Sequence, residues 1–449
     1  MARPALHVAP AGTHLPAEVT DLLASWAPGR RWYPAGVSGR PIPWQEVTVE
    51  DAPNVVLALL RAGDEATIVQ VPLVVFGKGD ARGSARADGA QRAYIGSAGG
   101  LDVYDGGQHP EAWAALLAAA GLPDADLTDA RVLAGEQSNT SVILPHTITE
   151  AAPAGAIMKI LRTITDGPHP DVTVPQALTG VGFTGTPLFL GAVEVSLAPV
   201  GPPEAHLAMV AALVPEAHDG FELACQYAGR GESFAELAAT LGATIAELHA
   251  ALRRALPVNE ALNVTDFCCL LRRRAIAAID IAFEALVPHE AAILDVYDNL
   301  EHVLNSASKP ARLQHIHGDL HLGQTLLGAD GWQVLDFEGE PQRPVAERTQ
   351  PDLPLRDVAG MLRSFDYAAV VGDCPDPAWV GEAQAAFLAA YRQASDMPND
   401  HMSSAILNAL VLDKSLYEVV YETRQRPHWV HIPLAAVEQI LVGSRKVVP

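Results

Sequence analysis

The sequence predicts an α+β protein in which a β-rich N-terminal part precedes a mainly helical C-terminal part. Short apolar runs, separated by clusters of Gly, Pro and polar residues, fill the first half and are typical of strands. From Ser233 onward, the apolar residues recur with a helical period. A chain of 449 residues also exceeds the size at which one hydrophobic core usually divides. We expect an N-terminal cap (1–90), an N-lobe (91–213) and a helical C-lobe (214–449).

The expected cap contains one short helix and one β-hairpin. The helix covers residues 17–27, and the apolar segments Asn54–Leu60 and Thr67–Phe76 are the two strands. The pair Gly63-Asp64 provides the turn between them. The segment Gly77–Ser84 is glycine-rich and basic but lacks the spacing of a phosphate-binding loop, so we interpret it as an ordinary loop.

The expected N-lobe begins with an alanine-rich helix over Pro110–Ala120. Its strands are β-branched and apolar runs separated by turn residues, at Ala130–Leu133, Ser141–Leu144, Ile157–Leu161 and Leu207–Leu213.

The most informative segment is His317–Gln324, which is followed closely by Trp332–Glu338. A short turn carries Asp319, whose carboxylate can accept a proton from a substrate hydroxyl. Gln324 offers an amide oxygen to a cation, and a short apolar strand then leads to Asp336, an anionic ligand for Mg²⁺ on the phosphates of ATP. This order of a base and two oxygen ligands predicts a kinase. A structural turn beside a strand is the alternative interpretation.

These motifs resemble those of the protein-kinase-like, or aminoglycoside phosphotransferase-like, small-molecule kinases, and most closely the maltokinase group with its related glucosamine kinases. The resemblance covers about Leu133–Leu434. It implies a bilobal protein-kinase-like fold, ATP and Mg²⁺ as cofactors, Asp319 as the catalytic base, and Gln324 and Asp336 as the metal ligands. Further segments that carry it are Gly135–Ser141, Asp336–Pro341, Pro354–Tyr367 and Tyr417–Pro427.

Two segments of the N-lobe are candidates for contact with the nucleotide, which in such a fold lies between the lobes. Gly135–Thr140 is a candidate flap in which Ser138 and Asn139 offer polar groups and backbone N–H donors to phosphate, with an ordinary hairpin turn as the alternative. Lys159 interrupts an apolar strand, where an unpaired ammonium group would be costly, so a polyphosphate is its expected partner. A lysine on an edge strand is the alternative.

The chain departs from the maltokinase pattern near this lysine. In that pattern a Glu follows a short turn and pairs with the lysine, whereas Thr173 occupies the corresponding position here. Either Asp171 replaces that Glu, or Lys159 has no helix carboxylate as its partner.

A polar helix near the C-terminus, Leu412–Glu422, is the candidate sugar site. Its helical spacing produces two neighbouring polar faces that mix carboxylates, a cation and tyrosines, as sugar binding requires. A solvated helix face is the alternative. The candidate substrate residues are His321, Asp413, Lys414, Tyr417, Glu418, Glu422 and Trp429.

Two polar residues, Asp357 and His249, have structural interpretations. Asp357 precedes a helix that is expected to begin at Val358, so we predict that it is the N-cap, with orientation of the metal loop as the alternative. His249 is interpreted as a hydrogen-bonded core histidine. His428 and His431 flank Trp429 without a third ligand at metal spacing, so no zinc site is expected.

The acceptor predicted from the polar helix Leu412–Glu422 is glucosamine, phosphorylated to glucosamine 6-phosphate. The carboxylates of the polar helix can bind a sugar ammonium group through charge-assisted hydrogen bonds. Maltose, phosphorylated to maltose 1-phosphate, is the alternative within the resemblance. A nucleotide-binding, pseudokinase-like regulatory subunit is the alternative of another class.

Composition excludes several partners. The chain has 30 basic and 53 acidic residues and a net charge of −23, which disfavours nucleic acid and anionic membranes. Its four cysteines form no CxxC pair, which favours reduced thiols in the cytoplasm. No stretch approaches eighteen consecutive apolar residues, so no membrane contact is expected. The expected protein is a cytoplasmic monomer or weak homodimer.

Overall fold

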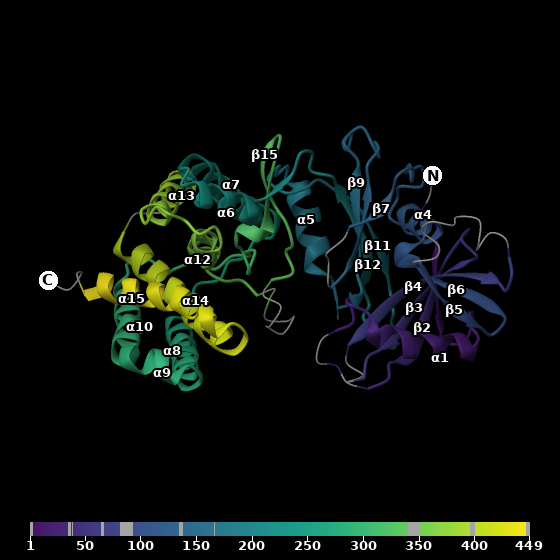
Figure 1. Ribbon diagram of the computed structural model, residues 1–449, viewed down its shortest axis with the longest axis horizontal. Helices are drawn as coiled ribbons and strands as arrows, with labels where there is room; N and C mark the ends of the chain where they lie inside the picture. Colours follow the sequence, from purple (N-terminus) through teal and green to yellow (C-terminus); the bar gives the residue numbers. More distant parts are fainter. Residues whose placement is uncertain are drawn as a thin grey trace. The chain divides into compact units, whose positions relative to one another are not determined.

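The computed structural model divides into two compact units, shown in Figure 1. Unit 1 comprises Met1–Gln176 and Pro187–Pro215, and unit 2 comprises Ala177–Thr186 and Glu216–Pro449. Unit 1 is rich in antiparallel strands and unit 2 is mainly helical, so the predicted α+β class is confirmed. The expected division at residue 90 stays a prediction. The residues described are 3–34, 37, 39–63, 67–80, 93–133, 138–165, 167–339, 348, 350–395 and 400–445.

The strands of unit 1 form two antiparallel sheets. The first has the order β1-β2-β3-β4-β6-β5, with β10 beside β4, and the second has the order β11-β12-β9-β8-β7. The strands are β1 (Leu6–Pro10), β2 (Ile42–Val49), β3 (Val55–Arg61), β4 (Ile68–Gly77), β5 (Tyr94–Ala98), β6 (Leu101–Asp105), β7 (Arg131–Val132), β8 (Thr140–Leu144), β9 (Ala156–Ile160), β10 (Thr163–Ile164), β11 (Phe189–Val195) and β12 (Ala205–Ala212). The helical elements are α1 (Ala17–Trp26), η1 (Ala27–Gly29), η2 (Gly106–Gln108), α4 (Pro110–Ala119) and the first part of α5 (Pro170–Gly180), whose residues from Ala177 onward belong to unit 2.

Strand β3 is apolar without interruption because both of its faces are buried. Val55, Leu57 and Leu59 join the core shared with α4 and the second sheet. The alternate residues of β3 join a second core, which lies under α1. The predicted β3–β4 hairpin and the helices α1 and α4 are confirmed, as are the strands predicted at β7, β8, β9 and β12. Asp64 of the predicted hairpin turn lies outside the described residues, as do residues 81–84 of the predicted loop.

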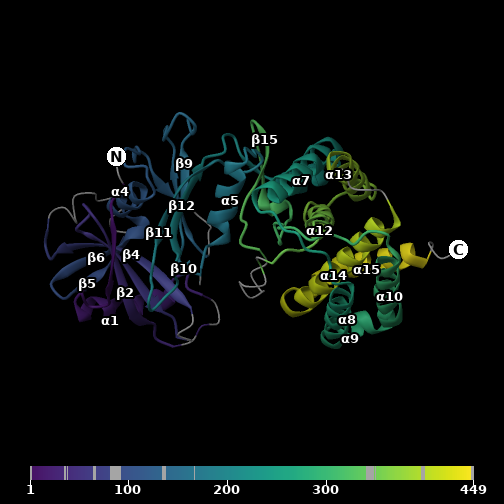
Figure 2. The same cartoon turned by 180° about the vertical axis from the view of Figure 1, so that it is seen from behind.

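In unit 2, α14 lies among the other helices and packs against α8, α10, α12 and α15, while α7 packs against α13 (Figure 2). A small sheet of order β13-β14-β15 carries the segment that follows Asp319. Within the described chain, no helix has the length and apolar character needed to span a membrane. The main elements are β13 (His218–Asp219), α6 (Gly220–Arg230), α7 (Ala235–Ala255), α8 (Val264–Ile281), α9 (Phe283–Leu286), η3 (Val287–His289), α10 (Glu290–Ser306), η4 (Leu322–Gln324), β14 (Thr325–Gly328), β15 (Gly331–Val334), α12 (Leu355–Val371), α13 (Trp379–Ser395), α14 (His401–Gln425), η5 (Pro427–Trp429) and α15 (His431–Arg445).

Candidate active site

The turn that carries Asp319 is held by the carboxylate of Asp357 on α12. The backbone N–H of His317 donates to Oδ2 of Asp357 at 2.8 Å, and that of Gly318 donates to Oδ1 at 2.9 Å. The prediction that Asp357 caps its helix is wrong, because α12 begins at Leu355 and its N-cap, Pro354, makes no side-chain cap bond. Asp357 therefore orients this turn, His317–Asp319, which is named the catalytic turn after the predicted base Asp319.

One face of α12 supports this segment over two helical turns. Asp357, Gly360 and Ser364 lie at spacings of three and four residues, which places them on the same face. A Cβ at Gly360 would lie 2.4 Å from the carbonyl oxygen of Leu320, so only glycine permits this approach. The hydroxyl of Ser364 accepts the backbone N–H of Leu322 at 3.2 Å.

A buried hydrogen-bond chain continues behind Asp357. Nε2 of His249 donates to Oδ2 of Asp357 at 3.0 Å, and the Tyr391 hydroxyl donates to Nδ1 of His249 at 2.8 Å. Burial and the nearby Asp357 carboxylate raise the pKa of Tyr391, so its hydroxyl keeps the proton that it donates. His249 is thus the hydrogen-bonded core histidine that the sequence predicts, and it also fixes the carboxylate that holds the catalytic turn.

His317 connects the catalytic turn to the next strand. Its Nε2 donates to the carbonyl oxygen of Leu335 at 2.8 Å, and its Nδ1 accepts the backbone N–H of Asp319 at 3.3 Å. Gly318 has φ of +87°, a conformation that glycine adopts without strain. These contacts fix the backbone on both sides of Asp319.

The two predicted metal ligands lie side by side. The Gln324 amide donates from Nε2 to Oδ2 of Asp336 at 3.3 Å, and the backbone N–H of Leu335 donates to the Gln324 carbonyl at 2.9 Å. Asp336 follows β15 with φ of +61°, a left-handed conformation that Asp tolerates better than most residues. An amide oxygen and a carboxylate at one place form a donor set that fits Mg²⁺.

The side chain of His321, a predicted substrate residue, caps the short helix η4. Its Nδ1 accepts the backbone N–H of Gly323 at 3.1 Å. Burial lowers the pKa of His321, and the Asp319 carboxylate only partly opposes this effect. The imidazole is therefore neutral at pH 7 with its proton on Nε2.

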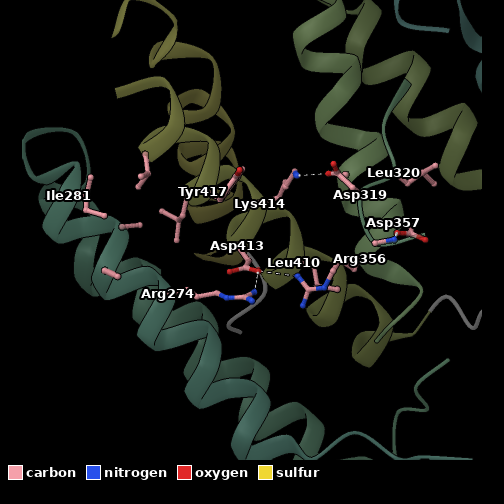
Figure 3. Close-up of a pocket in the computed structure, with 16 residues that line it drawn as sticks. Arg274, Ile281, Asp319, Leu320, Arg356, Asp357, Leu410, Asp413, Lys414 and Tyr417 are labelled. Atoms are coloured by element: carbon pink, nitrogen blue, oxygen red, sulfur yellow. Dashed lines mark hydrogen bonds and ion pairs between the residues drawn. The ribbon is translucent and has the colours of Figure 1, made fainter. Parts of the chain in front are cut away.

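A cavity of about 330 Å³ opens beside Asp319 within unit 2. It lies between α8, α12, α14 and the catalytic turn, as Figure 3 shows. Lys414 points into it and donates to Oδ1 of Asp319 at 3.4 Å. Asp413 and Tyr417 also line it, so three of the predicted substrate residues meet the predicted base in one cavity.

The other two predicted substrate residues on α14, Glu418 and Glu422, bind side chains outside the cavity. Glu418 is buried and accepts a hydrogen bond from Nε of Arg363 at 2.8 Å. Glu422 accepts the Tyr367 hydroxyl at 3.0 Å and the Arg426 guanidinium at 2.7 Å. None of these side chains lines the cavity.

Trp429 lies outside the cavity as well. Its ring packs near Tyr367, with centroids 6.3 Å apart, and the guanidinium carbon of Arg426 lies 4.3 Å from its ring centroid. These contacts connect η5 to α12 and to the end of α14.

Two arginines that the sequence did not indicate as substrate residues line the same cavity. Arg274 and Arg356 both donate to Oδ2 of Asp413, at 3.2 and 3.1 Å (Figure 3). Arg356 also binds Asp352 at 2.5 Å. Arg356 lies in Pro354–Tyr367, a segment that carries the family resemblance, so the sequence offered a signal for it. Helix α8, which carries Arg274, has only an ordinary helical pattern and offered none.

In unit 1, Lys159 pairs with the helix carboxylate of Asp171 at 2.5 Å. Asp171 therefore replaces the Glu that the maltokinase pattern has at the position of Thr173. Strand β9 lies between β12 and β8, so Lys159 is on a central strand and the edge-strand alternative is wrong. The two side chains are only 18% and 6% exposed.

The candidate flap is described only in part, because residues 134–137 lie outside the described residues. Ser138 and Asn139 precede β8, and Nδ2 of Asn139 donates to the Ser138 hydroxyl at 3.5 Å. The Asn139 carbonyl oxygen Oδ1 accepts the backbone N–H of Arg162 at 3.2 Å. Asn139 is buried, and the backbone of Arg162, between β9 and β10, fixes its side chain.

Comparison with known proteins agrees with this geometry. The model of the phosphotransferase enzyme family matches residues 204–404. A glucosamine kinase from Streptacidiphilus jiangxiensis is 31% identical over 411 residues, which cover 86% of this chain and 88% of the relative. A glucosamine kinase from Mycolicibacterium smegmatis is 28% identical over 332 residues, covering 69% and 79%.

Solved structures show the same similarity. A glucosamine kinase in complex with glucosamine, ADP and inorganic phosphate superposes with a TM-score of 0.64 at 25% identity, covering 94% of this chain and 98% of that one. A second crystal form of a glucosamine kinase has a TM-score of 0.65 at 24% identity, covering 95% and 100%.

Proposed function

Because the chain belongs to the glucosamine kinase family of phosphotransferases, we propose that it transfers the γ-phosphate of ATP to a hydroxyl of glucosamine, forming glucosamine 6-phosphate. The observation that carries this proposal is the cavity of unit 2, where Asp319 faces Lys414. The similarity to the Streptacidiphilus jiangxiensis relative, over 88% of its length, supports the same substrate.

Asp319 is the proposed catalytic base. The acceptor hydroxyl gives its proton to the carboxylate, its oxygen forms the bond to the γ-phosphorus, and the bond from that phosphorus to the β–γ bridging oxygen breaks to release ADP. Lys414 holds Oδ1 of Asp319, while Oδ2 has no donor among the described residues and is available to the hydroxyl. The contacts of Asp357 with the turn keep this carboxylate in position.

Gln324 and Asp336 are the proposed ligands of Mg²⁺. The ion, when bound, neutralises charge on the phosphates of ATP during transfer. The Gln324 amide lies against the Asp336 carboxylate at 3.3 Å, so a small rearrangement of the amide presents its oxygen beside the carboxylate oxygens. Lys159, with Ser138 and Asn139, is the proposed nucleotide-contacting group of unit 1.

Asp413 is the proposed partner of the sugar ammonium group. Besides Asp319, the proposed base, two carboxylates line the cavity: Asp357 is bound by protein donors on both oxygens, whereas Asp413 has donors on Oδ2. Glu418, which the sequence suggested for this role, is bound by Arg363 instead. The proposal for Asp413 therefore rests on its place in the cavity and its remaining oxygen.

The substrate test compares purified enzyme on glucosamine, glucose, N-acetylglucosamine and maltose. A hydrogen bond to a charged group contributes about 1.5–3 kcal/mol, so kcat/KM for glucosamine should exceed that for glucose by about ten- to a hundredfold. Asp413→Asn should reduce this ratio while glucose turnover stays closer to its original rate. Faster turnover of maltose than of glucosamine would contradict the proposal.

The catalytic test is Asp319→Asn, which keeps the side-chain shape but cannot accept the proton. Since a general base typically contributes about 10² to 10⁴ in rate, kcat should fall by that factor with unchanged thermal stability. Wild-type turnover in this variant would remove Asp319 from the role. Glucosamine-dependent ATP consumption by the wild-type protein would exclude the pseudokinase-like alternative.

A further inference from the structure

A second cavity lies within unit 1 and has a volume of about 270 Å³. Its walls come from the end of α1 and the residues after it, from β5 and β6, from β7 and the start of β8 with Asn139 before it, and from Arg162 between β9 and β10. Its lining includes the arginines Arg30, Arg31 and Arg162 and the aromatic residues Trp26, Trp32 and Tyr94. None of these residues belongs to the catalytic or acceptor site described in unit 2.

Arg162 is positioned rigidly beneath this cavity. Its Nη2 donates to both oxygens of Asp105, at 3.1 and 3.3 Å, and its Nε donates to the Thr140 hydroxyl at 2.9 Å. A Cβ at Gly107 would lie 2.0 Å from Nη2, so glycine is required for this position. The side chain is 1% exposed, and its Nη1 has no hydrogen-bond partner within the described part of the chain. A buried guanidinium with an unmatched N–H group favours an anion nearby.

Two more arginines lie at the exposed edge of the cavity. Arg30 and Arg31 have no carboxylate within ion-pair distance among the described residues. The ionised groups of the lining are three arginines and Asp105, which gives a local charge of 3 − 1 = +2. This local excess stands out in a chain whose net charge is −23, since most of its surface repels anions.

Aromatic rings form the other walls. The guanidinium of Arg162 lies 4.5 Å from the centroid of Trp32, and that of Arg30 lies 4.8 Å from the centroid of Trp26. The two tryptophan rings are 5.9 Å apart and tilted by 57°. Tryptophan faces pack well against the C–H face of a sugar, and the side-chain amide of Gln108 in the same cavity can bind a hydroxyl.

We propose that this cavity binds a monosaccharide phosphate. The arginines recognise the phosphate through charge-assisted, bidentate hydrogen bonds, and the tryptophans contact the sugar ring. A volume of about 270 Å³ is just below the usual range of drug-sized pockets, about 300–1,000 Å³, and so suits one ring with one phosphate. Asn139, one of the proposed nucleotide-contacting residues, also lines this cavity, whereas the catalytic and acceptor residues proposed in unit 2 do not.

Isothermal titration calorimetry of the full-length protein with glucose 6-phosphate tests this site. The wild-type protein should bind it more tightly than inorganic phosphate, which lacks the ring, and unphosphorylated glucose should not bind in this cavity. Arg30→Gln/Arg31→Gln should weaken binding at least about tenfold, because each lost charge-assisted hydrogen bond costs more than 1.4 kcal/mol. Binding should also weaken with rising salt concentration.

Two control variants show whether the ligand binds in this cavity or elsewhere on the protein. Arg40→Gln removes an arginine of the same unit that pairs with Asp21 at 2.6 Å and does not line the cavity, so it should bind like wild type. Lys414→Ala alters the acceptor cavity of unit 2 and should also leave this binding intact.

Equal affinity in the wild type and in the double arginine variant would overturn the proposal. Loss of binding in Lys414→Ala alone would also overturn it, by assigning the ligand to the acceptor cavity. Inorganic phosphate binding as tightly as glucose 6-phosphate would refute the sugar part of the assignment. Trp32→Leu, which keeps the arginines, should weaken glucose 6-phosphate binding without weakening phosphate binding.

Discussion

Replacing Asp357 by Asn tests whether α12 controls the catalytic turn. The carboxylate is buried, with a side-chain exposure of 0%. It accepts three hydrogen bonds, from the backbone N–H groups of His317 and Gly318 and from Nε2 of His249. An amide has only one oxygen. If that oxygen occupies the Oδ2 position, the new NH₂ group faces the N–H of Gly318, and two donors oppose each other.

The number of hydrogen bonds lost sets the expected decrease in the free energy of unfolding. One hydrogen bond to a charged group disappears, which costs about 1.5–3 kcal/mol. For a unit of this size, each kcal/mol lowers the melting temperature by about 2–4 °C, so we expect a decrease of roughly 3–12 °C. The hydrogen bond that is lost is the one from Gly318, the residue directly before Asp319, so Asp319 is expected to shift. Misplacing a catalytic group by about 1 Å can lower the rate about a hundredfold.

The assay measures both effects in the same protein preparation. Calorimetry gives the melting temperature, and a coupled ADP assay well below that temperature gives kcat and KM for glucosamine. We expect kcat to fall about a hundredfold while KM for glucosamine changes little, because Asp357 positions the base and its oxygens are taken up by protein donors. Asp298→Asn is the matched control, since this carboxylate also accepts a short bond, at 2.7 Å from Arg272, but is 65% exposed.

An Asp357→Asn protein with the melting temperature and kcat of the wild type would refute this reasoning. So would a rate loss of the same size in Asp298→Asn. A fall in the melting temperature with unchanged kcat would show that Asp357 stabilises the fold without positioning Asp319.

Three further outcomes are expected. Asp336→Ala should lose the Mg²⁺ dependence of ATP binding in calorimetry, and equal Mg·ATP affinity in both proteins would disprove the metal assignment. Asp171→Asn removes the ion pair between Asp171 and the Lys159 ammonium, so unit 1 should lose about 3–5 kcal/mol of stability and KM for ATP should rise, while KM for glucosamine stays constant. Burial lowers the pKa of His206 below its usual 6.5, so the unfolded chain binds more protons below that pH. The melting temperature should therefore decrease as the pH falls below 6.5, and a smaller decrease in His206→Gln, measured by scanning calorimetry, would confirm the source.

The neighbouring positions of two predicted metal ligands, Gln324 and Asp336, were predictable because both lie in one local segment. Gln324 and Asp336 are separated by a short hairpin in the chain, and in the structure the Gln324 amide contacts the Asp336 carboxylate. The same holds for the β3–β4 hairpin, where two apolar runs and a short connection specify an antiparallel pair. The strands β1, β2, β5, β6 and β11 were not predicted, because their mixed burial gives no clean alternation.

The polar side chains that face one another across helices were not predictable in this way. Helical spacing suggested that Asp413 and Glu418 belong to one sugar site, yet Arg274 and Arg356 bind the first at the cavity and Arg363 binds the second away from it. The spacing along α14 describes only that helix. Its neighbours α8 and α12 decide which polar groups meet a cavity and which meet an arginine.

The sequence by itself determined the α+β class and the order of the strand-rich and helical parts, because each depends on neighbours along the chain. The roles of Asp319, Gln324 and Asp336 stay predictions. The tertiary structure alone decided that Asp357 holds the turn and that Asp171 pairs with Lys159. The sequence around a carboxylate looks the same whether its side chain caps a helix, binds a distant backbone N–H group or pairs with a lysine. Its partner depends on the packing of elements far apart in the sequence, and only the folded chain fixes that packing.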